Sequence, residues 1–435
     1  MLRTVLTLWL TLTATLAAAA VEIEEITTPG GIEAWLVNEP SIPFVALEIR
    51  IEGGASLDAP GKRGATNLMM ALIEEGAGDM DARAFQTRRE ELAARFRFNA
   101  GDDLVSISAE VLTENRDEAL ALLRDALVTP RFDQDAIDRV RAQVLSGIAS
   151  DAKRPNTIAS NAFYAAAFPD HPYGSSMDGT VESVSGLTRD DIVAAHRAAL
   201  VRDRVYVGAV GDITAEELGP LLDALLGDLP TGGPDLPPDI DFALDGGKTV
   251  IEFETPQSVA LFGHSGIERA DPDYLAAYIL NEYLGGGGES VLMQEVREKR
   301  GLTYGVGTYL VPKFHAAMLI GQVASANATI AEAIEVTRAE WARVAADGMT
   351  QEELDEFKTF MTGEYPLRFD GNADIASILV GMQIIGLPSD YVLNRNDILA
   401  AVTLEDVNRV ARELLRPEDL HFVVVGQPAG LETGQ

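Results

Sequence analysis

An internal duplication is the feature that most constrains the fold of this chain. Residues 187–212 read LTRDDIVAAHRAALVRDRVYVGAVGD, residues 402–427 read VTLEDVNRVARELLRPEDLHFVVVGQ, and the two segments superpose without a gap. Each copy begins with a threonine suited to cap a helix, followed three residues later by an aspartate. An amphipathic helix and a short apolar strand that ends at glycine then follow. A repeat of this length predicts two similar structural units.

Matching elements upstream of each copy extend the repeat over most of the chain. Residues 45–51 and 104–111 alternate in polarity like half-buried strands, and residues 259–262 and 318–323 look like their counterparts in the second half. A helix follows in each half, with these residues on its apolar face: Leu120, Leu123 and Leu127 in the first, and Ile330, Ile334, Trp341 and Val344 in the second. Both halves are therefore expected to be α+β.

A connector separates the two halves. Residues 229–238 read LPTGGPDLPP, and four prolines and two glycines in ten residues disfavour both helix and strand. We therefore predict an N-terminal domain over residues 21–228, a linker over residues 229–245 and a C-terminal domain over residues 246–435. Two domains also suit the length of 435 residues, which is too long for one ordinary core.

The first twenty residues have the pattern of a signal peptide. Arg3 supplies a positive start, an apolar run follows over residues 5–16, and four alanines form a small-residue cleavage site. The run is too short for a comfortable membrane span, so we expect no membrane insertion. We expect an exported, periplasmic protein of a Gram-negative bacterium. The absence of cysteine excludes disulfides but does not identify the compartment.

The charge of the chain limits its partners. There are 68 acidic and 34 basic residues, which gives a net charge of −34. Nucleic acids and anionic lipids need concentrated positive charge, so neither is an expected partner. Cationic peptides would suit such a chain, and general solubility explains the acidity equally well.

The segment at residues 62–76, KRGATNLMMALIEEG, resembles the zinc helix of the insulinase/pitrilysin (inverzincin) family, whose motif is His-x-x-Glu-His. Glycines stand where that family has them, and the three motif positions then fall on Asn67, Met70 and Ala71. A catalytic zinc needs imidazole, carboxylate or thiolate ligands. Met70 also lacks the proton-transfer chemistry of the family's Glu. The resemblance therefore implies a zinc peptidase fold without its zinc site.

No replacement site is evident in the sequence. The chain has no cysteine, and no two of its five histidines lie within four residues of each other. In the family a further Glu ligand comes from a helix that here runs near residues 139–148, and this helix offers Ser146 and Gly147 instead. His171, in the phrase DHPYG that resembles another segment of the family, is expected to be structural. We expect no metal cofactor in this chain.

A second phrase, LGGGGESVLMQEVREKRGLTY at residues 284–304, resembles the family's C-terminal-domain segment, in which an Arg and a Tyr seven residues later reach the active site. Arg297 and Tyr304 have that spacing. A guanidinium can hold a peptide carbonyl or carboxylate, and a phenol can donate a hydrogen bond to a developing oxyanion. The glycine run is no phosphate loop, because no Gly-Lys-Ser/Thr follows it. Alternatively, both side chains brace a helix–turn–strand junction.

The resemblance covers nearly the whole mature chain and implies tandem αβ-roll domains. Some members of the family, like the processing peptidases, are heterodimers in which one chain carries the zinc motif and the other lacks it. We expect this chain to be such a non-catalytic subunit, inactive alone. It would contribute Arg297 and Tyr304 in trans to a zinc-bearing homologous partner and act with it on short or unfolded peptides. Zinc would be held by the partner.

Two other hypotheses remain at the level of the sequence. The chain could be a catalytically inert binding or scaffold protein of the same fold. It could also be a peptidase with an unfamiliar site, for which the carboxylate pairs Glu74-Glu75 and Asp102-Asp103 are candidates. Adjacent carboxylates are usually only solvated, so this third hypothesis is the least favoured.

Overall fold

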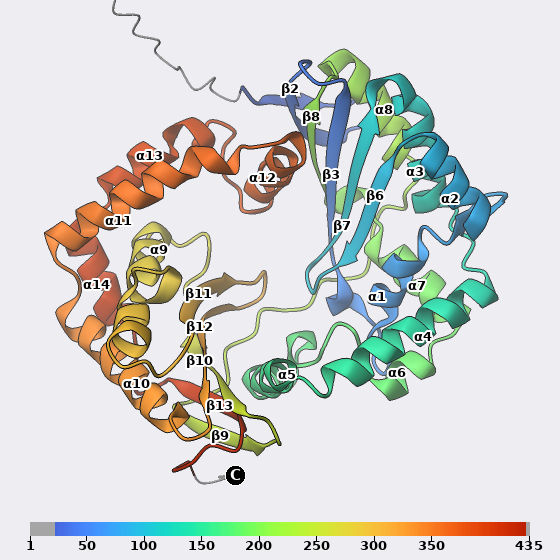
Figure 1. The fold of residues 1–435 in the computed structure, drawn as a ribbon. Coiled ribbons are helices and arrows are strands. Elements are labelled where there is room, and N and C mark those ends of the chain that lie inside the picture. The colour runs from blue at the N-terminus through green and yellow to red at the C-terminus, as the bar shows by residue number, and fades with distance from the viewer. Residues whose placement is uncertain (1–21, 432–435) are drawn as a thin grey trace, which may run out of the picture.

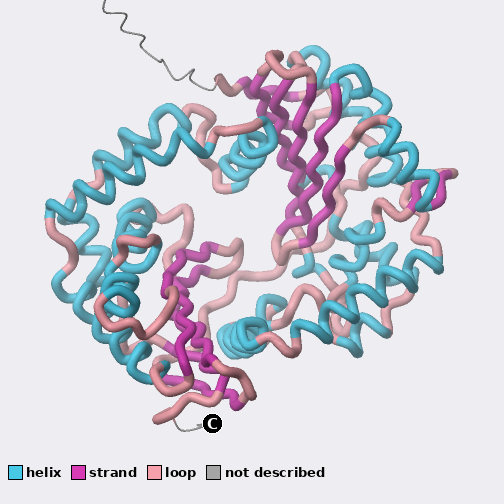
Figure 2. Tube along the Cα trace, viewed as in Figure 1, coloured by secondary structure: helices cyan, strands magenta, loops and turns pink. Residues whose placement is uncertain are grey.

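The computed structural model describes residues 22–431, which form two halves, each built on a β-sheet with helices on its outer side (Figure 1, Figure 2). The predicted signal peptide, residues 1–20, lies outside the described residues. The strands of the first half are β1 (Glu24–Thr27), β2 (Glu33–Asn38), β3 (Phe44–Glu52), β4 (Gly76–Ala77), β5 (Met80–Asp81), β6 (Arg95–Ala100), β7 (Leu104–Leu112) and β8 (Val205–Gly211). Its helices are α1 (Ala65–Leu72), α2 (Ala82–Glu91), α3 (Arg116–Val128), α4 (Gln134–Asp151), α5 (Pro155–Ala167), α6 (Val181–Ser185), α7 (Arg189–Ala199) and α8 (Ala215–Leu226).

The second half begins after the linker and has one main sheet. Its strands are β9 (Gly247–Glu252), β10 (Gln257–Ser265), β11 (Val306–Pro312), β12 (Ala317–Ala326) and β13 (His421–Gly426). Its helices are α9 (Tyr274–Asn281), α10 (Ile330–Asp347), α11 (Gln351–Glu364), α12 (Asn372–Ile384), α13 (Tyr391–Ala401) and α14 (Leu404–Leu414), with π-helical turns at Glu282–Gly286 and Met293–Glu298. No helix among residues 22–431 combines the length and apolar character needed to cross a membrane.

The two main sheets share one topology, which confirms the predicted duplication. The first has the strand order β1-β2-β8-β3-β7-β6, and the second has the order β9-β13-β10-β12-β11. The strand of the repeated segment is β8 in one half and β13 in the other. Each pairs in parallel with one neighbour, β2 or β9, and antiparallel with the other, β3 or β10. The helix of the segment begins in each copy with a capping box, at Thr188 and at Thr403.

The sheet of each half is covered by a helix from the other half. Phe163 of α5 packs in a cluster with Leu261 of β10 and Val423 of β13, so this first-half helix lies on the second sheet. Conversely, α12 packs on strands β3 and β8 of the first sheet. The approach is so close that a Cβ on Gly208 would come within 2.6 Å of the carbonyl oxygen of Ala376. The halves are therefore joined by exchanged helices as well as by the linker.

The linker also packs against the exchanged helix. Residues 230–245 contain no helix or strand, as their composition predicts. Phe242 lies 5.8 Å from Phe163 between ring centroids, and the amide of Ala243 donates to the carbonyl of Ala167 at the end of α5. The segment is thus held along its length, although the domain boundaries drawn on either side of it remain a prediction.

Candidate functional site

Helix α1 corresponds to the zinc helix of the family resemblance, and its start is fixed by Asp58. The carboxylate of Asp58 accepts hydrogen bonds from the amides of Gly64 and Thr66 and from the Thr66 hydroxyl, at 2.7 to 2.9 Å. Burial raises the pKa of Asp58, while these hydrogen bonds act in the opposite direction. Gly64 has a φ of 97°, and a Cβ there would stand 2.7 Å from the carbonyl of Asp178. The family-like glycine therefore has a local structural reason in this chain.

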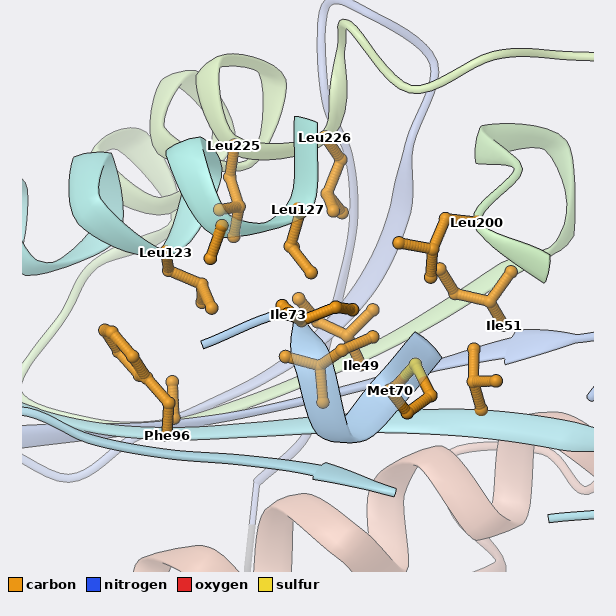
Figure 3. Packing of buried hydrophobic residues seen from close by; sticks show 14 of the residues in the cluster. Ile49, Ile51, Met70, Ile73, Phe96, Leu123, Leu127, Leu200, Leu225 and Leu226 are labelled. Atoms are coloured by element: carbon orange, nitrogen blue, oxygen red, sulfur yellow. The ribbon is translucent and has the colours of Figure 1, made fainter. Parts of the chain in front are cut away.

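The three motif positions on α1 do not converge on a common point. The amide of Asn67 donates to Oδ1 of Asp178 at 2.9 Å. Met70 is 1 % exposed and lies in the core beside Ile49 and Ile51 (Figure 3). Ala71 is exposed and offers no donor atom. These residues do not fit a zinc ion. The Asn67 amide is hydrogen-bonded to Asp178, Met70 faces the core, and the Ala71 side chain is a methyl group.

The rest of the described chain offers no substitute for these ligands. Ser146 and Gly147 of α4 are both exposed, and neither is a good zinc ligand. Over residues 22–431, no group of three or more histidine, aspartate or glutamate side chains is placed to hold a metal ion.

Both carboxylate pairs considered as an alternative site are engaged in structural contacts. Glu74 pairs with Arg89, and Glu75 accepts two hydrogen bonds from the guanidinium of Arg139, at 2.6 and 3.0 Å. Asp102 and Asp103 are half-buried at the tip of the β6–β7 hairpin, so they are not the solvated loop pair that the sequence suggests. The reason is that this tip contacts the second half of the molecule.

The tips of the two equivalent hairpins, β6–β7 and β11–β12, meet at the junction of the halves. Asp102 lies 2.9 Å from Arg63 and 2.5 Å from Lys313, which follows β11. Asp103 accepts a hydrogen bond from the Tyr173 hydroxyl at 2.5 Å. The Lys313 ammonium also lies over the Tyr173 ring, 4.2 Å from its centroid. Charge pairs and a cation–π contact thus fix the halves relative to each other.

A histidine pair at this junction has no signal in the sequence. The rings of His171 and His315 lie 6.1 Å apart, one from each half. Nδ1 of His171 accepts from the amide of Tyr173, and His315 lies 3.1 Å from Asp239. Burial, followed by the proximity of His315, lowers the pKa of His171. Sequence spacing tests only for pairs on one local element, so it misses a pair that forms between two halves.

A cavity of about 1380 Å³ lies beside this junction. Its wall includes the residues just before α1, the loop that contains Asp178, one face of α5, and Lys313 and Gln322 from the second half. Asp178 is the residue that accepts the hydrogen bond from Asn67. The cavity therefore lies against the same segment as the altered zinc motif.

Arg297 and Tyr304 are both accessible on the second half. Arg297 lies on the π-helical turn Met293–Glu298, and its side chain is 46 % exposed. Its one ion pair within residues 22–431 is with the adjacent Glu298 at 3.5 Å. Tyr304 is 87 % exposed, and its hydroxyl makes no hydrogen bond to any of residues 22–431. The structure places both on one surface segment, without a direct hydrogen bond between them.

Other residues brace the junction that the alternative assigns to Arg297 and Tyr304. The Thr303 hydroxyl lies within hydrogen-bond distance of the carbonyls of Gly305 and Ala324, at 2.8 and 2.6 Å. The Ser325 hydroxyl donates to the carbonyl of Leu302 at 2.5 Å. Leu302 itself is buried in the second core. This junction is held by buried neighbours of the Arg/Tyr pair and not by the pair.

A second cavity lies beside the Arg/Tyr phrase. It has a volume of about 310 Å³ and is lined by Gly285–Gly287, at the start of the Arg/Tyr phrase, and by residues 305–307, which directly follow it. Gln322 of β12 lines both this cavity and the larger one. The glycine-lined cavity and the cavity at the junction therefore adjoin at a single side chain.

Comparison with known proteins agrees with this geometry. The family model for insulinase (peptidase family M16) matches residues 34–181, and the model for the peptidase M16 inactive domain matches residues 186–361. The "Non-peptidase homolog YmxG" of Helicobacter pylori is 24 % identical over 88 % of this chain and 89 % of its own. The "Uncharacterized zinc protease YmxG" of Bacillus subtilis is 25 % identical over 94 % of this chain and 99 % of its own.

Solved structures show the same fold over the full length. The peptidase M16 inactive domain from Pseudomonas fluorescens superposes with a TM-score of 0.88 at 26 % identity, covering 95 % of this chain and 100 % of the other. A protease from Helicobacter pylori superposes with a TM-score of 0.83 at 17 % identity, covering 94 % and 100 %. With its two α+β halves and its replaced zinc motif, this chain belongs to the insulinase family, peptidase family M16, as an inactive member.

Proposed function

We propose that this chain is the non-catalytic subunit of a heterodimeric zinc peptidase and contributes Arg297 and Tyr304 to a zinc-bearing homologous partner. The observation that carries the proposal is the exposure of both side chains in a segment whose fold depends on other residues. A phenol that is 87 % exposed and a guanidinium paired only with its own neighbour are available to a substrate or a second chain. The burial of Met70 in the core supports the other part of the proposal, which is that α1 of this chain does not perform hydrolysis.

The chemistry of the pair suits amide hydrolysis. Arg297 would hold a peptide carbonyl or carboxylate, because a guanidinium presents two donors in fixed geometry. Tyr304 would donate a hydrogen bond from its hydroxyl group to the oxyanion that develops on the attacked carbonyl. The partner's zinc would supply the activated water. Short or unfolded peptides are the proposed substrates, and the periplasm is the proposed compartment.

The test is peptide hydrolysis by this chain, by a zinc-bearing homologue from the same genome, and by their mixture. This chain alone is expected to be silent and to hold no stoichiometric zinc by mass spectrometry. The mixture is expected to be active and to elute as one complex in gel filtration. A silent mixture with no complex, together with copurification in a large assembly, would instead support the binding or scaffold role.

Variants of the pair then test the contribution in trans. Arg297→Ala and Tyr304→Phe are expected to lower kcat of the mixture by about a hundredfold to a thousandfold, the range for loss of one transition-state donor, while the complex still forms. Arg300→Ala and Tyr391→Phe are the controls. Arg300 is a nearby arginine paired with Glu295, and Tyr391 is a partly exposed tyrosine on α13 that lines neither cavity. Normal turnover in both Arg297 and Tyr304 variants would refute the contribution in trans.

A further inference from the structure

Helix α5 has two faces of opposite character. Ala159, Phe163 and Ala167 are buried against the second sheet. The other face lines the cavity of about 1380 Å³ with a row of uncharged polar side chains, which are Asn156, Thr157, Ser160, Asn161 and Tyr164. Their spacing along the helix places them on one side, one turn after another. Helix α5 therefore presents an amide and hydroxyl surface to the cavity, which we call the polar face of α5.

The polar groups on this face of α5 are not used by the fold. The side chains of Asn156, Thr157, Ser160 and Asn161 make no hydrogen bond to any of residues 22–431, and the same holds for the Tyr164 hydroxyl. Each of them can both donate and accept. These groups are therefore available to a molecule in the cavity.

The charges in the cavity wall are mostly compensated within the protein. Lys62 pairs with Asp191 at 2.8 Å, and Arg63 and Lys313 both pair with Asp102. Among the acidic wall residues, Asp151 pairs with Arg154, whereas Asp178 accepts a hydrogen bond from the uncharged amide of Asn67. Asp178 and Glu182 are the two wall carboxylates that have no ion pair within residues 22–431. Most charges of the wall are thus paired within the protein, and the wall offers a ligand chiefly uncharged hydrogen-bonding groups.

The main chain of a peptide matches this wall. Every non-proline residue carries one N–H donor and one C=O acceptor, which is the complement of amide and hydroxyl side chains. The cavity exceeds the usual 300 to 1,000 Å³, roughly, of a site for a small molecule, so it can admit a length of chain. It shares Gln322 with the glycine-lined cavity, so a peptide bound there would lie next to the Arg/Tyr phrase.

We infer that the polar face of α5 binds the main chain of the substrate peptide, and so makes binding by this subunit independent of the peptide's side chains. This inference rests on the proposed function for the identity of the ligand. It adds to that function a broad substrate range. Peptides with uncharged, charged, small or large side chains are accepted alike, because the contacts are to main-chain groups that all residues share.

Binding by the isolated chain tests the inference without any partner or zinc. The probe is a fluorescein-labelled peptide of about ten residues built from serine, alanine and glycine, followed by anisotropy. Asn156→Ala combined with Asn161→Ala is expected to weaken binding about tenfold, as the loss of two hydrogen bonds does. Gln143→Ala combined with Asn394→Ala, at exposed helix positions outside the cavity, is the control and should bind within about twofold.

Three further measurements isolate the main chain as the contact. A peptide of the same sequence with N-methylated amides should lose binding, because its donors are blocked. Peptides with other side chains should bind within about threefold, and raising NaCl from about 0.05 to 0.5 M should have little effect. Equal binding of the N-methylated peptide, strong salt dependence, or displacement by a neutral oligosaccharide would each overturn the inference.

The two proposals can fail separately. If the wild-type chain binds no probe peptide while Arg297→Ala still lowers kcat of the mixture, the inference about α5 is wrong and the proposed function stands. If the probe binds through Asn156 and Asn161 but no zinc-bearing partner is activated, the proposed function is wrong and the binding site stands. When both hold, the α5 variant should raise KM of the mixture and leave kcat nearly unchanged.

Discussion

At the scale of the residue, Met70 shows that one position of the family's zinc motif is a buried core residue in this chain. The sequence predicts the loss of zinc ligands, because the ligand chemistry is absent from positions 67, 70 and 71. It does not predict which of these positions faces inward. That depends on how α1 packs against β3, where Met70 meets Ile49 and Ile51 (Figure 3).

The substitution Met70→Glu tests this burial. A carboxylate placed in the core is expected to lower the free energy of unfolding by on the order of 3 kcal/mol, because burial without a partner is costly. Ala71→Glu, one position further on the exposed side of α1, should change it by less than about 0.5 kcal/mol. Urea unfolding of both variants gives the comparison. Equal effects would contradict the position of Met70.

His264 predicts a pH dependence of stability. Burial lowers its pKa from 6.5 to about 4, and its Nδ1 lies 2.7 Å from the carbonyl of Ser265. A depressed pKa means that the unfolded chain binds the proton more readily. The contribution of neutral His264 to the free energy of unfolding is therefore fully present above pH 6.5 and is lost as the pH falls to about 4.

For the lowered pKa of His264, the full loss of unfolding free energy is about 3 kcal/mol. Urea unfolding at several pH values should show that wild type loses more stability over this interval than His264→Asn, in which the titrating group is absent and the side-chain amide can still donate to Ser265. Parallel pH profiles for the two proteins would show that His264 does not titrate in this way.

At the scale of the element, the repeated strands and helices were predictable and the exchange of α5 and α12 was not. Alternating polarity and capping residues are local signals, and β3, β7, β10, β12, α7 and α14 form where those signals stand. An apolar helix face in the sequence predicts that the helix packs against another element, but it does not predict which sheet that element belongs to. The exchange places Phe163, from the first half, against the second sheet.

Phe163→Ala should therefore weaken the joint between the halves. Truncating a fully buried phenylalanine leaves a cavity and is expected to cost roughly 3 to 5 kcal/mol. Phe360→Ala on α11 is the control, because Phe360 is 60 % exposed and its loss should cost less than about 0.5 kcal/mol. Scanning calorimetry should show a lower Tm for the first variant only. An unchanged Tm for Phe163→Ala would contradict the packing of α5.

At the scale of the whole molecule, the site is assembled from distant parts of the chain. The sequence identifies the altered motif and the Arg/Tyr phrase separately, since each is a continuous segment. It cannot show that Asp102, Asp103 and Lys313 join two hairpin tips, or that Gln322 lines both cavities. Those relations exist only once the two sheets are placed against each other.

The exchange also predicts that the halves depend on each other. A fragment ending before the linker would expose the apolar face of α5 and lose the cover that α12 gives to the first sheet. Residues 22–228 and 246–431 expressed separately are expected to aggregate, because large apolar surfaces stay open. Coexpression of both should restore a soluble complex, detected by gel filtration. Two soluble, monomeric fragments would contradict this dependence.

Two copies of one unit, each lending a helix to the other, have the geometry of a domain-swapped dimer whose subunits are joined into one polypeptide. In a swapped dimer of separate chains, every change appears twice. Joining the copies removes that constraint, so one copy can lose its zinc ligands while the other keeps an Arg/Tyr phrase. The swap itself is unaffected, because it depends on α5, α12 and the sheets they cover. The fold can thus outlast the loss of its original chemistry.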